Sequence, residues 1–193
     1  MRLASLDYGH SLGNRLLFRF IGLASRQPVP GIVKLVKYRA NFFGEPMSAL
    51  AQRAMRGPSV WSVGDRELMA AVIAQANACR YCVAAHSAVA ALAYHDEARV
   101  AAVLSNPEAA PIAEPLRTTL SMLTKLAHAH HVDAGDMRML FAAGASRAHI
   151  EDALAVGFAF NIINRLADAF EFPIPDAKAF AASARFLLTR GYR

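Results

Sequence analysis

The chain has 193 residues, of which 55% are hydrophobic and 19% charged, and its formal net charge at pH 7 is +6. This composition supports one buried core, so we predict a single domain and exclude a disordered chain. No apolar run approaches the roughly 18 residues of a membrane-spanning helix, and no cleavage site follows the N-terminal apolar residues, so we expect a cytoplasmic protein without membrane association.

The excess of positive charge lies in residues 1–60, which contain nine basic and two acidic residues. The basic side chains are spaced singly, as they are on a solvated helix face, and they form no basic run. We therefore expect no nucleic-acid partner. A surface for an anionic partner, a nucleic acid or a membrane face stays open as an alternative reading of this segment.

Apolar spacing predicts helices along the whole chain, and no segment alternates as a strand does. The predicted helices run, in chain order, from residue 12 to before Pro28, then over 47–56, 62–77, 79–95, 116–126, 133–144, 146–172 and 177–188. Ser62 is expected to cap the third of these, with Asp65 placed to answer it. We predict an all-α, single-domain helical array with a basic helical N-terminal extension (1–60), a core (61–175) and a C-terminal helix (176–193).

The only two cysteines, Cys79 and Cys82, carry the strongest chemical signal. In a reducing compartment, a pair three residues apart is more typical of redox catalysis or metal binding than of a structural disulfide. If a helix begins at Cys79, then Cys79, Cys82 and His86 lie within an arc of about 60° on one face. The two α-carbons then lie within the approximately 4.4 to 6.8 Å that a disulfide tolerates.

The position at a helix N-terminus predicts a reactive thiol, because unpaired amide groups and the helix macrodipole stabilise a thiolate. His86, one turn beyond Cys82, is placed to accept its proton or to pair with the thiolate. Two alternatives stay open. One is a zinc site in which Glu67 or a histidine joins Cys79, Cys82 and His86, and the other is a pair of inert buried thiols.

Glu67, Cys79-x-x-Cys82 and His86, in this order and spacing, resemble the signature of the alkylhydroperoxidase D-like branch of the carboxymuconolactone decarboxylase superfamily. The flanking segments that fit the same pattern are residues 62–72 and 77–87, and residues 161–170 resemble a segment of its peroxidase-related members. The resemblance covers at least residues 57–173. It implies an all-helical fold of the alkylhydroperoxidase D type, thiol-dependent reduction of peroxides, and assembly into trimers or higher oligomers such as hexamers.

The resemblance also implies a role for each site residue. Cys82 is the cysteine that attacks the peroxide, Cys79 is the resolving cysteine, and Glu67 and His86 form a proton relay. The substrate is a small hydroperoxide, the reductant is an external dithiol or a thioredoxin-like or lipoyl partner, and no cofactor or metal is bound. Tyr81 stands where the best-known peroxidases of the family have an additional histidine, so a group with an ordinary pKa of about 10 replaces one that exchanges protons near pH 7.

A second function for the same dithiol stays open, namely a redox-responsive regulatory or binding protein that forms the disulfide without sustained turnover of peroxide. Four polar residues of the last long helix, Asn161, Asn164, Arg165 and Asp168, interrupt its apolar stripe. We expect some of them to be buried and hydrogen-bonded, joining subunits or bracing the helix that carries the dithiol, rather than catalytic.

Overall fold

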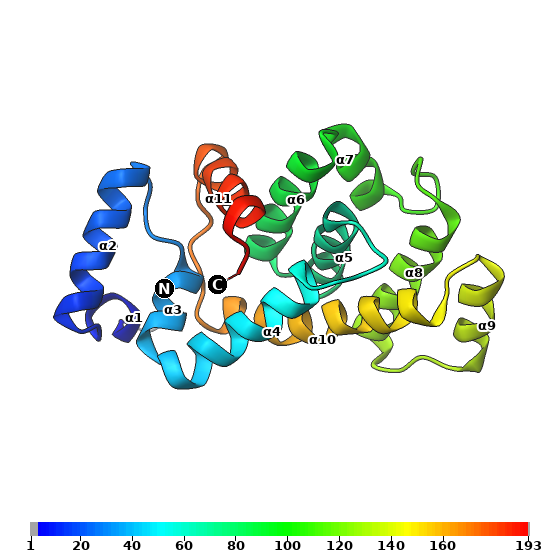
Figure 1. The fold of residues 1–193 in the computed structure, drawn as a ribbon, viewed down its shortest axis with the longest axis horizontal. Coiled ribbons are helices and arrows are strands. Elements are labelled where there is room, and N and C mark those ends of the chain that lie inside the picture. Colours follow the sequence, from blue (N-terminus) through cyan, green and yellow to red (C-terminus); the bar gives the residue numbers. More distant parts are fainter. Residues whose placement is uncertain (1–3, 193) are drawn as a thin grey trace.

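The computed structural model describes residues 4–192, and every regular element of this part of the chain is a helix (Figure 1). The predicted all-α fold is confirmed. The elements are α1 (Ser5–Tyr8), α2 (Leu12–Ser25), α3 (Gly31–Tyr38), the π-helical turn η1 (Ala40–Gly44), α4 (Glu45–Arg56), α5 (Val63–Ala76), α6 (Arg80–Tyr94), α7 (Glu97–Ser105), α8 (Glu114–Ala129), α9 (Ala134–Ala142), α10 (Arg147–Ala169) and α11 (Ala177–Arg190). Among the described residues, no helix combines the length and the apolar character that a bilayer crossing requires.

Helix α5 is the central element of the fold, and most of its side chains are buried. Ser62 caps it as predicted: the Ser62 hydroxyl accepts a hydrogen bond from the Asp65 amide at 3.1 Å, and the Asp65 carboxylate accepts one from the Ser62 amide at 3.0 Å. Leu68, Met69 and Ile73 are fully buried in the main hydrophobic core. A helix that is apolar on all sides is stable only when neighbours cover it, and α4, α6, α8 and α10 do so here.

The helices predicted from apolar spacing are all present, and their ends differ from the predicted ones by a few residues. Helices α1 and α3 were not among them, and neither was α7. Asp96 caps it by accepting a hydrogen bond from the Arg99 amide at 2.9 Å, directly after α6 ends at the left-handed residue His95. Only Val100 and Val103 of this short helix are buried, so its apolar pattern extends over a single turn and gives little periodic signal.

Of the first three helices, α1 and α3 contribute side chains to the cluster around the two cysteines, whereas α2 lies at the edge of the molecule. Leu6 of α1 and Leu35 of α3 are fully buried in one cluster with Cys79 and Cys82, so these helices cover the start of α6. Helix α2 has no buried residue and lies at one end of the molecule (Figure 1). Its most exposed large apolar side chains are Leu12, Leu16, Phe20 and Leu23.

Candidate active site

The connection between α5 and α6 places the two cysteines. Helix α5 ends in a Schellman motif, in which the Cys79 amide donates to the Ala74 carbonyl at 2.9 Å and the Ala78 amide donates to the Gln75 carbonyl at 3.0 Å. Ala78 has a φ of 58°, a left-handed conformation in which glycine is usual. Cys79 then caps α6, and its carbonyl accepts the first helical hydrogen bond from the Val83 amide at 3.0 Å. The dithiol is thus tied to the end of the central helix.

Both thiols are free and buried, with 0% of Cys79 and 2% of Cys82 exposed. The pKa of the Cys82 thiol is raised, first by its hydrogen bond with Cys79, then by burial, and then by the negative charges of Cys79 and Asp168. These effects disfavour the Cys82 thiolate and so oppose the stabilisation that the sequence led us to expect from the helix N-terminus. Cys82 needs a base to take its proton.

Glu67 is fully buried in α5 and has three hydrogen-bond partners. His86 Nδ1 lies 2.7 Å from Glu67 Oε2, while the Arg56 guanidinium donates to Oε1 at 2.7 Å and the Tyr192 hydroxyl donates to the same oxygen at 2.9 Å. A buried carboxylate costs several kcal/mol unless it is paired and hydrogen-bonded. The structure therefore brings Glu67 and His86 together and gives the carboxylate the partners that its burial requires.

The Glu67–His86 pair has a defined proton position. Burial raises the pKa of Glu67, but the hydrogen bond and charge of His86 and the pairing with Arg56 outweigh burial, and the net effect lowers the pKa. An ionised carboxylate only accepts hydrogen bonds, so His86 Nδ1 donates to Glu67, and in the neutral imidazole Nε2 is the nitrogen that accepts a proton. The His86 ring packs edge to face on Phe160, with centroids 4.4 Å apart. His86 is thus an oriented base one turn beyond Cys82.

Two partners of Glu67, Arg56 and Tyr192, are not among the residues predicted from the sequence. Arg56 ends α4, inside the segment assigned to the N-terminal extension, and Tyr192 follows α11. Gly191, the residue before Tyr192, has a φ of 70°, and a Cβ at Gly191 would clash with the Gln52 side chain. A buried carboxylate needs hydrogen-bond donors, but no local sequence pattern indicates which distant residues supply them.

An open cavity of about 260 Å³ adjoins the dithiol. It is lined by Ala78, Arg80, Tyr81, Ala167, Asp168, Glu171, Phe172 and Ile174. Tyr81 packs edge to face on Phe172, with ring centroids 5.4 Å apart. Burial raises the pKa of Tyr81 above its ordinary value, so Tyr81 keeps its proton at neutral pH. The cavity thus has aromatic and charged walls and is lined by the residues on either side of Cys79 in the chain, Ala78 and Arg80.

Helix α10 directs several polar side chains toward this region. Asn161 Oδ1 accepts a hydrogen bond from Asn77 Nδ2 at 3.0 Å and so braces the turn just before Cys79, in line with the role expected for it. Arg165 is exposed and donates to the Asn161 carbonyl at 2.6 Å. Asn164 is fully buried, and its side chain has no hydrogen-bond partner in the described part of the chain.

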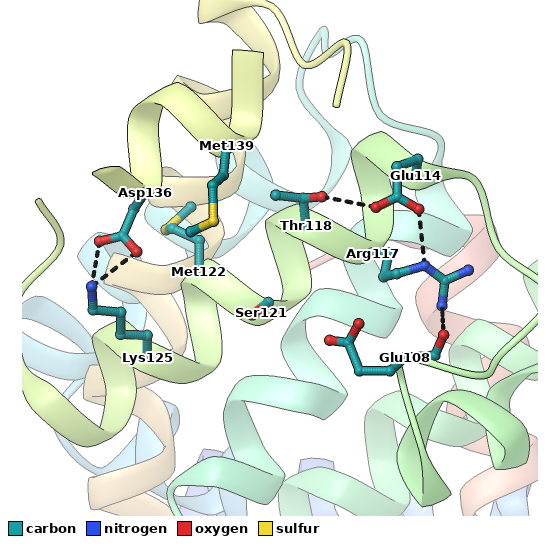
Figure 2. A pocket seen from close by; sticks show the side chains of 9 residues that line it. All are labelled: Glu108, Glu114, Arg117, Thr118, Ser121, Met122, Lys125, Asp136 and Met139. Carbon is teal, nitrogen blue, oxygen red and sulfur yellow. Dashed lines mark hydrogen bonds and ion pairs between the residues drawn. The ribbon is translucent and has the colours of Figure 1, made fainter. Parts of the chain in front are cut away.

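A second cavity, of about 180 Å³, is lined mainly by residues of α8 and α9 (Figure 2). Lys125 Nζ donates to Asp136 at 2.7 and 2.9 Å, and Arg117 donates to Glu114 at 3.1 Å, so these charged walls neutralise one another. None of its lining residues is a cysteine or a histidine. Across residues 4–192, no group of three or more His, Cys, Asp and Glu side chains is arranged to hold a metal ion, so the zinc alternative has no ligand set there.

One protein-family model matches the middle of the chain. Residues 43–125 match the model of the carboxymuconolactone decarboxylase family. The resemblance to this superfamily is confirmed. The matched segment contains Glu67, Cys79, Cys82 and His86, whereas Tyr192 lies outside it. No curated protein matched the chain.

Two solved structures share the fold of this chain. One is an uncharacterized peroxidase-related protein from Silicibacter sp. TM1040, with a TM-score of 0.73 and 24% identity over 88% of this chain and 87% of that one. The other, from Ralstonia eutropha JMP134, is described as an alkylhydroperoxidase AhpD core and an uncharacterized peroxidase-related protein, with a TM-score of 0.73 and 22% identity over 93% of both chains. This likeness confirms the predicted helical array of the alkylhydroperoxidase D type.

Proposed function

We propose that the chain is a thiol-dependent hydroperoxide reductase that uses Cys79, Cys82, His86 and Glu67 and needs no bound cofactor. The observation that carries this proposal is the buried Glu67–His86 pair, whose Oε2 to Nδ1 distance is 2.7 Å, one helical turn beyond Cys82. Such a pair supplies a general base for a thiol whose pKa is raised and which is a weak nucleophile while protonated. The peroxidase-related names of the two similar structures also support this function.

In the first step, the peroxide oxidises Cys82. The Cys82 thiol transfers its proton to His86, and the Glu67 carboxylate stabilises the imidazolium that results. The thiolate attacks the terminal oxygen of the hydroperoxide, so that an S–O bond forms as the O–O bond breaks. The leaving alkoxide takes the proton from His86, which yields an alcohol and a sulfenic acid on Cys82.

In the second step, Cys79 resolves the sulfenic acid. The Cys79 sulfur attacks the Cys82 sulfur, and the departing hydroxide combines with the Cys79 proton to form water. The resulting disulfide is reduced by an external dithiol, thioredoxin-like or lipoyl, through two thiol–disulfide exchange steps that restore both thiols. Because both sulfurs are buried, we assign the open cavity beside Tyr81 as the route by which the reductant reaches them.

We further propose that the chain acts in the cytoplasm as a homo-oligomer, either a trimer or a hexamer. Its free cysteines fit a reducing compartment. Exposed apolar side chains support self-association: Phe158 and Ile162 of α10 are 61% and 40% exposed, and the apolar face of α2 is uncovered. Light scattering after size-exclusion chromatography measures the mass, and a monomer at micromolar concentration would contradict this part of the proposal.

Turnover with tert-butyl hydroperoxide tests the function, with dihydrolipoamide and reduced thioredoxin as alternative electron donors. We expect many moles of tert-butanol per mole of protein, none with Cys82→Ser, and a dimedone-trapped sulfenic acid on Cys82 in Cys79→Ser. A disulfide that forms once, with no dithiol sustaining turnover, would contradict the reductase. That result would favour the redox-responsive regulatory protein instead.

A further inference from the structure

Asn164 of α10 is a buried amide without a hydrogen-bond partner. Its side chain is 0% exposed, and within residues 4–192 neither Oδ1 nor Nδ2 is paired. A buried polar group left in this state costs about 1–3 kcal/mol, and an apolar side chain of similar size would avoid the cost. Packing alone therefore does not explain an asparagine at this position.

The neighbours of Asn164 along α10 place it level with Cys82. One turn before it, Phe160 packs against the His86 ring with centroids 4.4 Å apart. One turn after it, Ala167 lies in the same buried cluster as Cys82. Residues three and four apart share one face of a helix, so Asn164 lies on the face of α10 that looks toward His86 and the dithiol.

The same face of α10 continues into the open cavity of about 260 Å³. Ala167 and Asp168 line this cavity together with Tyr81 and Phe172. The charge of Asp168 also contributes to the raised pKa of Cys82, so this end of α10 is close enough to act on the sulfur. Asp168 is one turn beyond Asn164, so the wall of the cavity and the unpaired amide belong to the same side of α10.

We propose that the Asn164 amide binds the peroxide group of an organic hydroperoxide and positions it for attack by Cys82, a role that rests on the proposed reductase function. The hydroperoxy O–H donates to Oδ1, and the substituted oxygen accepts from Nδ2, so one amide matches both oxygens. Negative charge develops on the substituted oxygen as the O–O bond breaks, and Nδ2 stabilises it until His86 delivers the proton. The aromatic walls of Tyr81 and Phe172 take the organic substituent.

The test compares two reactions of Cys82 in the full-length reduced protein, each followed by quenched-flow mass spectrometry of the Cys82 peptide. One is oxidation by tert-butyl hydroperoxide, and the other is alkylation by iodoacetamide, which needs the thiolate but has no peroxide group. In Asn164→Leu we expect oxidation to fall roughly 100-fold while alkylation changes by less than about threefold. The midpoint of thermal unfolding should stay equal or rise, because the unpaired amide is gone.

Asn161→Leu is the matched control on the same helix. It loses the hydrogen bond to Asn77 and is expected to lower the thermal midpoint while leaving the ratio of the two rates unchanged. Asn164→Ala repeats the measurement with a small side chain. Unchanged oxidation in both Asn164 variants, or an equal fall of both rates, would overturn the role of Asn164. A wild-type Cys82 that hydroperoxide oxidises no faster than free dithiothreitol would instead overturn the reductase itself.

Discussion

His86 Nδ1 and Glu67 Oε2 lie 2.7 Å apart between the two most closely packed helices of the fold, α5 and α6. The contact links the buried carboxylate of the central helix to the helix that carries the dithiol. Arg56 and Tyr192 hold the other oxygen of the same carboxylate, at 2.7 and 2.9 Å. Three segments of the chain, namely α4, α6 and the segment after α11, thus meet at one buried carboxylate of α5, which links them and orients the His86 ring.

Replacing Glu67 by Gln is expected to destabilise the protein by about 3 kcal/mol, because it leaves the Arg56 charge in a buried site without its partner. Urea unfolding at pH 7 measures this. The pKa of Glu67 is lowered from its ordinary value of 4.5, so its contribution is fully present above that pH and is lost as the pH falls through the lower folded-state pKa. The difference in free energy of unfolding between the wild type and Glu67→Gln should therefore shrink on acidification below about pH 4.5. An equal stability at pH 7 would contradict the ion pair.

Replacing Tyr192 by Phe removes only the hydroxyl that donates to Glu67 at 2.9 Å. We expect a loss of about 1–2 kcal/mol in the free energy of unfolding, since hydrogen bonds to charged groups contribute more than neutral ones. The control is Tyr8→Phe, at a side chain that is 76% exposed, which should change stability by no more than about 0.5 kcal/mol. Equal effects of the two substitutions would argue against a role for the C-terminal tyrosine in holding the carboxylate.

Replacing Cys79 by Ala is expected to lower the pKa of Cys82. The hydrogen bond with Cys79 is the largest cause of the raised pKa, and Asp168 contributes least. The rate of Cys82 alkylation by iodoacetamide, measured as a function of pH, should therefore shift to lower pH in Cys79→Ala. Asp168→Asn should shift it in the same direction by less. A shift to higher pH in either variant would show that these groups do not oppose the thiolate.

Replacing Ala78 by Gly is expected to stabilise the protein by about 0.5–1 kcal/mol, because a left-handed φ of 58° is strained for alanine and free for glycine. Thermal unfolding followed by circular dichroism measures the change. Ala76→Gly, two residues earlier and still helical, is the control and should destabilise by about 1 kcal/mol. A loss of stability in both variants would contradict the strain that we assign to the turn before Cys79.

The helices and the dithiol followed from the sequence because their signals are local. Apolar spacing and the Ser62 cap predict α5. A Cys-x-x-Cys pair at the start of a helix brings its two α-carbons within disulfide distance, whatever the rest of the fold. Glu67 and His86 are 19 residues apart on different helices, and spacing alone does not join them. The family resemblance supplied that pair, and the structure shows the contact.

The residues that sequence reasoning missed depend on tertiary packing. Arg56 and Tyr192 flank the predicted core (61–175) on its two sides, and they meet because α4 and the C-terminal segment both pack against Glu67. The sequence predicted that some polar residues of α10 are buried, but it did not single out Asn164 or predict that its amide has no partner in the described chain. Ala78 in a left-handed turn also gives no sign in the sequence, since glycine is the usual marker.

The central claim is that the Glu67–His86 pair activates Cys82 toward a peroxide. The most direct test is the second-order rate constant for oxidation of Cys82 by one equivalent of tert-butyl hydroperoxide, compared among the wild type, Glu67→Gln and His86→Gln, each shown to be folded by circular dichroism. The account predicts sulfenic acid or disulfide at Cys82 in the wild type and a rate roughly 100-fold lower in both variants. Oxidation of both folded variants at the wild-type rate would contradict it.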